Sequence, residues 1–363
     1  MRIALVSTPF VSVPPVDYGG TELVVYELAE GLVRRGHEVV VFATGDSTTR
    51  AGVRALYARP VWPPECFAEL NHVSWALREI VEDGNFDLIH VHSASALACA
   101  RLAEHLPMVY TLHHERVADL SRFYEAFPHV HFVAISDDQR GREVPLPHVE
   151  VIHHGLDPRL YAWRERPLDY ACFLGRFSPV KGVHVAIDVA GAAGVGIRLA
   201  GRVHAEDERW AERVLYPRLD LPHVRPLGCV GMAAKVPLLR DARALLAPID
   251  WEEPFGLALV EAMLSGCPVV AFPRGSVPEL VEEGVTGYIA RSAEEMVELI
   301  APGGPLEHFD RRRCRKRAIE RFSSRRMASD YEQLYERILT PHPSTGDRGD
   351  RRAPADRRQL HVA

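Results

Sequence analysis

Apolar runs alternate with amphipathic segments along most of the chain. The run Arg2–Ser7 predicts a strand, and Thr21–Arg35 has the spacing of an amphipathic helix that ends at Gly36. Further apolar runs predict strands at 38–43, 86–92, 109–112, 131–136 and 149–153. Because these runs are apolar throughout, they are typical of strands that are covered on both faces, as in a parallel sheet.

The pattern stops at Gly155–Pro167, where prolines and charges indicate a linker between domains. It then resumes with strands predicted at 170–175, 197–201, 224–227, 244–247 and 269–272, and helices near 181–193, 206–219, 233–242 and 256–265. A strand–helix–strand order implies parallel sheets with right-handed crossovers. We therefore predict an α/β protein in which two Rossmann-like, doubly wound domains, residues 1–160 and 161–323, face each other across a cleft.

The last part of the chain has helical patterns at 305–322 and 324–339. We expect the helix at 324–339 to join the first domain. The basic run Arg311–Arg317 predicts a solvated helix face. The tail 340–363 is rich in Pro, Gly and Arg and is predicted to be disordered.

Composition narrows the class of protein. A length of 363 residues with 47% hydrophobic residues suits two domains. A net charge of −6 argues against a nucleic-acid partner. The six cysteines are widely spaced, and neither a signal peptide nor an apolar run of transmembrane length is recognisable, so we expect a cytoplasmic protein. Arginine is abundant, so the only three lysines, Lys181, Lys235 and Lys316, stand out.

The strongest chemical motif is EEPFGLALVEAMLSGCPVV at Glu252–Val270. Its Pro-Phe-Gly sequence predicts a helix that begins near Gly256, and the free N–H groups at a helix start attract phosphate. Glu253 stands just before that start, and Glu261 lies about two turns further, roughly 10 Å away. Two carboxylates so far apart are suited to hold two parts of one long ligand. The alternative is a capped helix with solvated glutamates.

A second motif is GRFSPVKG at Gly175–Gly182, between a predicted strand and a predicted helix. Arg176 and Lys181 can together neutralise a diphosphate without a metal ion. The alternative is a surface ion pair. No Asp-x-Asp pair, which could hold such a metal, occurs in the chain.

Two further motifs follow strands of the first half. Tyr18-Gly19-Gly20 lets the backbone approach a phosphate or a sugar, with a plain tight turn as the alternative. His113 and His114 follow the strand at 109–112, where no third metal ligand has suitable spacing. One of them could donate a hydrogen bond to a sugar, and packing is the alternative.

These motifs resemble those of retaining glycosyltransferases of family 4, which have the GT-B fold. The resemblance extends from Met1 to about Tyr335. It implies that Glu253 contacts the donor sugar, that Glu261 binds the ribose hydroxyls, and that Arg176 and Lys181 grip the donor diphosphate. The backbone of four further residues would face the sugar and diphosphate: Phe255, Gly256, Leu257 and Ala258.

The same resemblance assigns the remaining site residues. Gly19 and Gly20 would lean over the diphosphate, and His113 would contact the transferred sugar, whereas His114 would pack or face the acceptor. Cys229 and Val230 would lie against the nucleobase, and Gly201 near the donor. The chain departs from the family at His154, where asparagine is usual, and at 199–207, which lacks the usual glycines.

The function that this implies is transfer of a sugar from a UDP, GDP or dTDP sugar to an acceptor hydroxyl, with retention of configuration and with neither cofactor nor metal. The acceptor could be a small molecule or a lipid-linked glycan, which leaves open a peripheral contact with a membrane. Relatives in high-GC bacteria serve envelope glycans, small thiols or antibiotics such as avilamycin. The alternatives are an epimerase or phosphorylase on the same fold, or a non-catalytic nucleotide-sugar binding protein.

Overall fold

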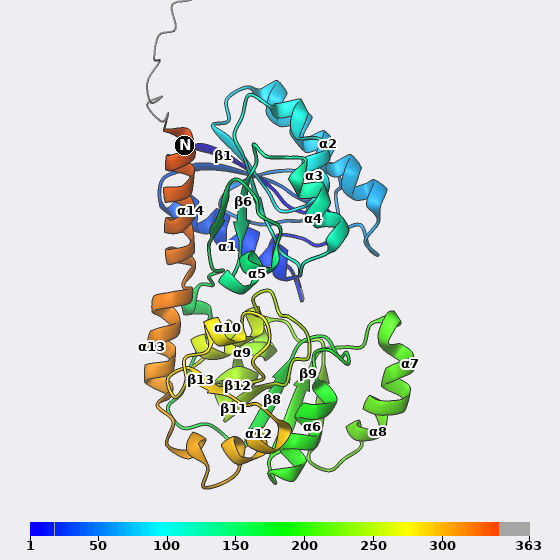
Figure 1. Ribbon diagram of the computed structural model, residues 1–363, viewed down its shortest axis with the longest axis vertical. Helices are drawn as coiled ribbons and strands as arrows, with labels where there is room; N and C mark the ends of the chain where they lie inside the picture. Colours follow the sequence, from blue (N-terminus) through cyan, green and yellow to red (C-terminus); the bar gives the residue numbers. More distant parts are fainter. Residues whose placement is uncertain (18, 341–363) are drawn as a thin grey trace, which may run out of the picture.

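The computed structural model describes residues 1–17 and 19–340, which form two α/β domains stacked along the long axis of the molecule (Figure 1). Tyr18 and residues 341–363 lie outside the described part, so the prediction for the tail falls almost wholly outside it. The predicted fold class is confirmed: each domain is built on one parallel sheet with helices on both faces.

The sheet of the first domain has seven parallel strands among the described residues, in the order β3-β2-β1-β4-β5-β6-β7. The strands are β1 (Arg2–Val6), β2 (Glu38–Phe42), β3 (Gly52–Arg54), β4 (Leu88–Val91), β5 (Met108–Thr111), β6 (His131–Ala134) and β7 (Val149–Val151). The helices between them are α1 (Gly20–Arg34), α2 (Cys66–Asp83), α3 (Ser95–Ala98), η1 (Ala100–Ala103), α4 (Ala118–Glu125) and α5 (Asp137–Arg142), and η2 (Pro158–Leu160) follows β7.

The sheet of the second domain repeats this order with six parallel strands, β10-β9-β8-β11-β12-β13. The strands are β8 (Tyr170–Leu174), β9 (Gly196–Ala200), β10 (Val224–Gly228), β11 (Ala244–Ala247), β12 (Val269–Ala271) and β13 (Gly287–Ile289). The helices that follow β8 along the chain are α6 (Val183–Ala192), η3 (Ala205–Asp207), α7 (Glu208–Trp210), η4 (Ala211–Leu215), α8 (Tyr216–Leu219), α9 (Met232–Asp241), α10 (Leu257–Leu264), α11 (Val277–Leu280), α12 (Ala293–Ile300), η5 (Pro305–His308), α13 (Arg311–Phe322) and α14 (Ser324–Leu339).

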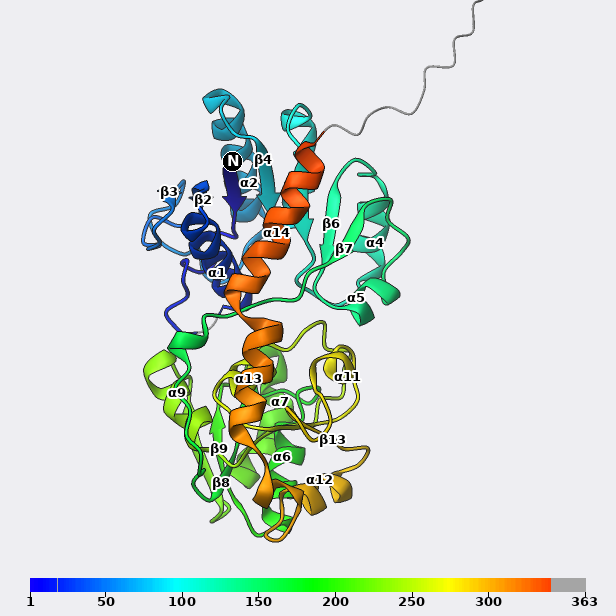
Figure 2. The ribbon, with the colours of Figure 1, turned by 90° about the vertical axis from the view of Figure 1, so that its left-hand side faces the viewer.

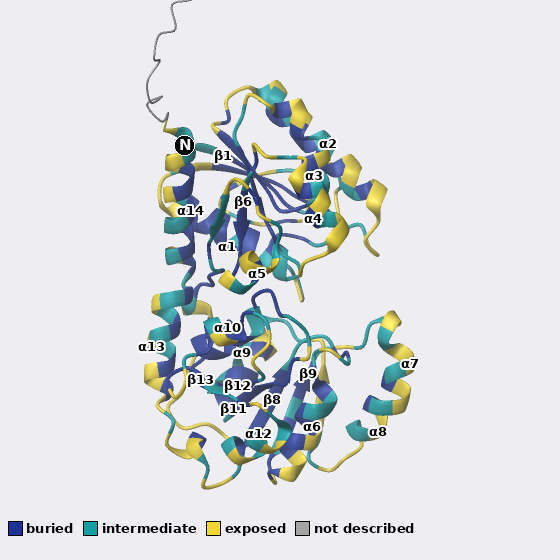
Figure 3. Ribbon diagram, in the orientation of Figure 1, coloured by how far each residue is buried: buried dark blue, intermediate teal, exposed yellow. Residues whose placement is uncertain are grey.

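Burial on both faces explains why the strands are apolar throughout. In β1, Ile3 and Leu5 belong to one buried cluster, and Ala4 and Val6 belong to the cluster on the opposite face of the sheet. Figure 3 shows the strands buried at the centre and the outward faces of the helices exposed. In each sheet the strand order reverses beside the first strand, between β1 and β4 and between β8 and β11. Ligands of such sheets bind where the order reverses, beyond the carboxyl ends of the strands.

The last two helices connect the domains along one side of the molecule (Figure 2). Helix α13 packs against α10 of the second domain, whereas α14 packs against α1 of the first. Met327, Tyr331 and Tyr335 of α14 belong to the buried cluster beside β1. Among residues 1–17 and 19–340, no helix combines the length and the apolar character that crossing a bilayer requires.

Two predicted helices differ from the structure. The segment predicted as one helix at 206–219 is divided into η3, α7, the π-helical turn η4 and α8, and Pro217, which has no N–H to donate, lies in α8. The helix predicted at 305–322 begins only at Arg311, because the side chain of Asp310 accepts a hydrogen bond from the N–H of Arg313 and caps the helix there. The residues before it form the separate short helix η5.

The prediction of a solvated face for the run Arg311–Arg317 is wrong for two of its arginines. Arg311 is buried and donates to the carbonyl of Ala242 at 2.6 Å and to that of Arg240 at 2.6 Å. Arg315 donates to the carbonyl of Tyr161 at 2.5 Å. The last carbonyls of a helix have no partner within the helix, and α9 ends at this point, so Arg311 supplies the missing donors.

Candidate active site

A cleft of about 530 Å³ lies between the two domains, at the carboxyl ends of their strands. It is lined by every residue that the sequence motifs singled out for the site: Gly19, Gly20, His113, Arg176, Lys181, Gly201, Cys229, Val230, Glu253, Phe255, Gly256, Leu257, Ala258 and Glu261. The first three come from the first domain and the others from the second. Their common location is a finding of the structure, and the role of each stays a prediction.

The helix that the EEPFG motif predicted is α10. Gly256 precedes it with φ 89°, in the left-handed region that other residues disfavour, and no side chain caps the helix. Among the described residues, the N–H groups of Leu257 and Ala258 donate to no protein acceptor. Free N–H groups and the positive end of the helix dipole therefore face the cleft, an arrangement that binds phosphate.

Lys181 and Glu253 are paired across the cleft wall, with Nζ and Oε2 2.5 Å apart. The indole N–H of Trp251 donates to the same oxygen at 3.0 Å, and the lysine Nζ lies 4.5 Å from the centroid of the Trp251 ring. Glu253 is buried, so its carboxylate depends on these two donors. Trp251 was not predicted, although it directly precedes the motif and stands only two residues before Glu253.

Arg176 follows β8 at the reversal of strand order and pairs with the loop after β9. Its guanidinium lies 2.9 Å from Glu206 and 3.8 Å from Asp207. Both acids belong to 199–207, where the chain departs from the usual family pattern. Arg176 thus forms the ion pair that the alternative interpretation predicted, and its own side chain lines the cleft.

Glu261 lies on α10 and is held by residues from two other segments. The ammonium group of Lys235, from α9, bonds to its Oε1, and the hydroxyl of Tyr161 donates to the same atom at 3.0 Å. Burial and the neighbouring carboxylate raise the pKa of Tyr161, so the hydroxyl stays a donor. Among the described residues, no group donates to Oε2 of Glu261, which leaves that oxygen to accept from a ligand.

Gly201 follows β9, where only glycine fits. A Cβ at this position would lie 1.9 Å from the carbonyl oxygen of Gly175, and its φ is 153°. The loops after β8 and β9 therefore pass in close contact at the floor of the cleft. Cys229 and Val230 follow the next strand, β10, and line the same side of the cleft.

The first domain contributes Gly19, Gly20 and His113. Gly20 opens α1 close to α10 of the other domain, since a Cβ there would lie 3.4 Å from Leu257 Cδ1. His113 hydrogen-bonds to His92 and stacks on His154, with ring centroids 5.3 Å apart. Burial lowers the pKa of His113 to about 3, so its ring is neutral near pH 7. His154, the departure from the family pattern, also lines the cleft.

His114 points elsewhere. Its Nε2 accepts a hydrogen bond from the hydroxyl of Tyr124 at 2.9 Å, and its Nδ1 donates to the carbonyl of Glu115 at 2.7 Å. It does not line the cleft, which agrees with its interpretation as a packing residue. Among the described residues, no group of three or more His, Cys, Asp or Glu side chains is placed to hold a metal ion.

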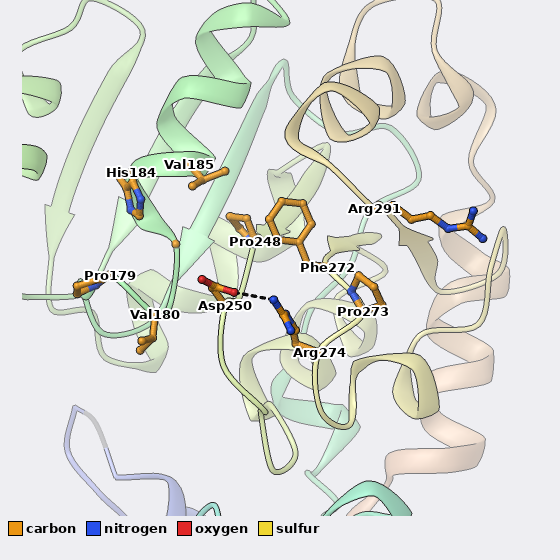
Figure 4. Close-up of a pocket in the computed structure, with 11 residues that line it drawn as sticks. Pro179, Val180, His184, Val185, Pro248, Asp250, Phe272, Pro273, Arg274 and Arg291 are labelled. Atoms are coloured by element: carbon orange, nitrogen blue, oxygen red, sulfur yellow. Dashed lines mark hydrogen bonds and ion pairs between the residues drawn. The ribbon is translucent and has the colours of Figure 1, made fainter.

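A second concavity of about 570 Å³ lies on the second domain (Figure 4). Pro179 and Val180 line it, as do Arg274 and Asp250, which form an ion pair at 2.9 Å. It contains none of the residues predicted to act in the site. The chemistry that the motifs predict is therefore gathered in the interdomain cleft.

Comparison with known proteins agrees with this arrangement. The family model for Glycosyltransferase Family 4 matches residues 18–160, and the model for Glycosyl transferases group 1 matches residues 169–301. A phosphatidyl-myo-inositol mannosyltransferase of Mycobacterium leprae is 28% identical over 378 residues, which cover 94% of this chain and 98% of that protein.

Two solved structures share the two-domain architecture. AviGT4, a glycosyltransferase involved in avilamycin A biosynthesis, is 26% identical, with a TM-score of 0.71 over 93% of this chain and 98% of that one. Anabaena HepE, in complex with UDP and glucose, has a TM-score of 0.72 and 21% identity over 93% of this chain and 99% of its own. The chain therefore belongs to family 4 of the glycosyltransferases and has the GT-B fold.

Proposed function

We propose that the protein transfers a sugar from a nucleotide-diphosphate sugar to an acceptor hydroxyl with retention of configuration and without a metal ion. The observation that carries this proposal is the gathering of Arg176, Lys181 and the start of α10 on one side of the cleft, opposite His113. Two basic side chains and a helix N-terminus together suit a pyrophosphate. Glycosyltransferase activity itself follows from the family.

Binding of the donor would change the hydrogen-bond partners of Lys181 and Glu253. The diphosphate would attract Lys181 away from Glu253, and Glu253 would then accept a hydrogen bond from a sugar hydroxyl. Oε2 of Glu261 would accept from the ribose hydroxyls, with Lys235 and Tyr161 holding the carboxylate in place. The HepE complex with UDP and glucose supports a uridine nucleotide as the first donor to test.

In the reaction, the bond between the anomeric carbon and the phosphate oxygen breaks, and a bond from that carbon to the acceptor oxygen forms on the same face. The acceptor proton passes to an oxygen of the leaving diphosphate. Negative charge grows on the diphosphate as it leaves, so Lys181, Arg176 and the α10 N–H groups stabilise the transition state more than the bound donor. Closure of the domains would exclude water from the cleft.

For the acceptor, we propose a secondary metabolite or an envelope glycan. AviGT4 supports the first, because that protein takes part in the biosynthesis of avilamycin A. The mannosyltransferase of Mycobacterium leprae supports the second, since its name gives phosphatidyl-myo-inositol as its acceptor. The two classes differ in whether a lipid carries the hydroxyl, so acceptor panels of both kinds belong in the assay.

The test is incubation with UDP, GDP and dTDP sugars, with and without a chelator, while nucleoside diphosphate release is measured. We expect slow release with one of these donors, unchanged by the chelator, and a transfer product with the anomeric configuration of the donor. Loss of activity on chelation would contradict metal independence. An epimerase would change the sugar without release, a phosphorylase would require inorganic phosphate, and a binding protein would bind the nucleotide sugar without turnover.

A further inference from the structure

Four histidine rings lie in contact one after another from the core of the first domain to the cleft, and only the last pair is stacked. The centroid of His90 lies 4.2 Å from that of His92, which lies 5.1 Å from that of His113, and His154 follows at 5.3 Å. Tyr335 and Thr111 hydrogen-bond to the two nitrogens of His90 at the buried end. At the other end, His113 and His154 line the cleft. This row of histidines therefore connects the core to the predicted sugar site.

The proton between His92 and His113 can be assigned from their partners. His92 Nδ1 lies 2.8 Å from His113 Nε2, so one of these nitrogens donates to the other. His92 Nε2 is buried and has no hydrogen-bond partner among the described residues. If His113 were the donor, the proton of His92 would sit on this Nε2 as a buried N–H without an acceptor. Such orphaned donors are rarer than orphaned acceptors, so His92 carries its proton on Nδ1 and donates.

The consequence concerns the other nitrogen of His113. Since Nε2 of a neutral His113 accepts, the proton of that ring sits on Nδ1. Burial lowers the pKa of both His92 and His113, which keeps the two rings neutral near pH 7. Within residues 1–17 and 19–340, no group hydrogen-bonds to His113 Nδ1. A single N–H donor is therefore available on a residue that lines the cleft.

We propose that His92 is a positioning residue that holds His113 as the Nδ1–H tautomer and thereby directs one hydrogen-bond donor to a hydroxyl of the transferred sugar. The assignment of a sugar hydroxyl as the acceptor rests on the proposed function, whereas the assignment of the His113 tautomer does not. The nearly parallel ring of His154, with an interplanar angle of 19°, holds the other side of His113 in place. No proton transfer is involved, because His113 keeps the same tautomer throughout.

The direct test is NMR of the wild-type protein labelled with ¹⁵N at histidine. Long-range proton–nitrogen correlations distinguish a protonated ring nitrogen from an unprotonated one. The set of cross-peaks that is lost in the spectrum of the His113→Asn variant belongs to the His113 ring. We expect a protonated Nδ1 and an unprotonated Nε2. A protonated Nε2 would overturn the proposal. This measurement needs no turnover, so it decides the tautomer even if no donor is used.

A matched pair of variants tests the positioning role. Asparagine has an amide near the position of Nδ1 and can still donate to His113, whereas leucine has the same shape and cannot. For release of nucleoside diphosphate, we expect kcat/KM about 10-fold lower in His92→Leu and within about twofold of wild type in His92→Asn, since one hydrogen bond is lost only in the former. His92→Leu should also lose the single tautomer in the NMR spectrum.

Two results would contradict the role of His92. One is full kcat/KM in His92→Leu with an unchanged spectrum. The other is an equal loss in His92→Asn and His92→Leu when both variants melt at the wild-type temperature, since a purely structural role would not separate them. If the wild-type protein turned over no nucleotide sugar, the proposed function would fail, and the NMR result would still decide the tautomer.

Discussion

Lys181 Nζ lies 2.5 Å from Glu253 Oε2, so two residues predicted to act on different parts of the donor are bonded to each other in the structure. Trp251 binds the same carboxylate oxygen and places its ring beside the lysine. The pair keeps two buried or half-buried charges neutralised. A bound diphosphate would compete with Glu253 for Lys181. The ion pair therefore couples binding of the donor diphosphate, predicted for Lys181, to binding of the donor sugar, predicted for Glu253.

We predict that Lys181→Ala lowers kcat on the order of 10²–10³, because it removes a charge that faces the leaving diphosphate. Glu253→Ala should lose transfer to a similar extent, since it removes the acceptor for the sugar hydroxyl. The measurement is kcat and KM for nucleoside diphosphate release, together with the melting temperature. Lys316→Ala is the matched control, because Lys316 is exposed on α13 and does not line the cleft. Normal turnover by Lys181→Ala would refute the assignment.

The ion pair of Arg176 with Glu206 predicts opposite effects of its two partners. Arg176→Ala should raise KM and lower kcat by about 10², because the arginine faces the diphosphate. Glu206→Ala should lower the donor KM by no more than about fivefold, since an exposed ion pair is worth about 0–1 kcal/mol. Asp188→Ala breaks the Arg218 pair on the outside of the second domain and serves as the control. A higher KM in Glu206→Ala would count against Arg176 as a donor-binding group.

Gly256 and Gly284 allow backbone strain to be separated from donor binding. Both have positive φ, 89° and 68°, so alanine at either position should cost about 1–2 kcal/mol of stability. A Cβ at Gly256 would lie 3.0 Å from Leu259 Cδ1 at the start of α10, whereas nothing lies within 4 Å of one at Gly284. We expect Gly256→Ala to weaken binding of the nucleoside diphosphate in calorimetry and Gly284→Ala to leave it unchanged. Equal affinities would show that the start of α10 does not hold the diphosphate.

The strands were predictable from the sequence where both faces of the sheet are buried. Strands with both faces covered are apolar throughout, and the predicted positions of β1, β2 and β8 agree with the structure to within one residue at each end. The edge strand β3 was missed because two of its three residues are exposed, which leaves no apolar run. Helix α2 was missed as well, and Glu65, the N-cap residue that precedes it, makes no side-chain cap that would mark a start.

The site was predictable where one motif carries its chemistry, as in EEPFG and GRFSPVKG. Contacts between distant segments could not be predicted in the same way. Tyr161 and Glu261 are 100 residues apart, and only folding brings the hydroxyl to the carboxylate. The bond between His92 and His113 depends on the adjacent pairing of β4 and β5. The pairing of Arg176 with Glu206 depends likewise on a loop whose course the motifs do not reveal.

Glu27 is a buried carboxyl group at the junction of the domains. It lies on α1 and accepts a hydrogen bond from the backbone N–H of Asp157 at 3.0 Å, with the side chain of Ser324 close by. Asp157 belongs to the segment that leaves the first domain, and Ser324 begins the helix that returns to it. Burial raises the pKa of Glu27 from 4.5 to about 7, because the charged form is poorly solvated there.

This raised pKa makes stability depend on pH in a predictable direction. Between pH 4.5 and 7 the folded protein binds more protons than the unfolded chain, so Glu27 reduces stability progressively as the pH rises through this window. Above about pH 7 the cost is roughly 3 kcal/mol, since a tenfold shift in the proton equilibrium corresponds to about 1.4 kcal/mol. Glu27→Gln cannot ionise but can still accept from the N–H of Asp157. We therefore expect its urea midpoint to exceed that of wild type more at about pH 8 than at about pH 5, and parallel pH profiles would show that Glu27 does not titrate in this range.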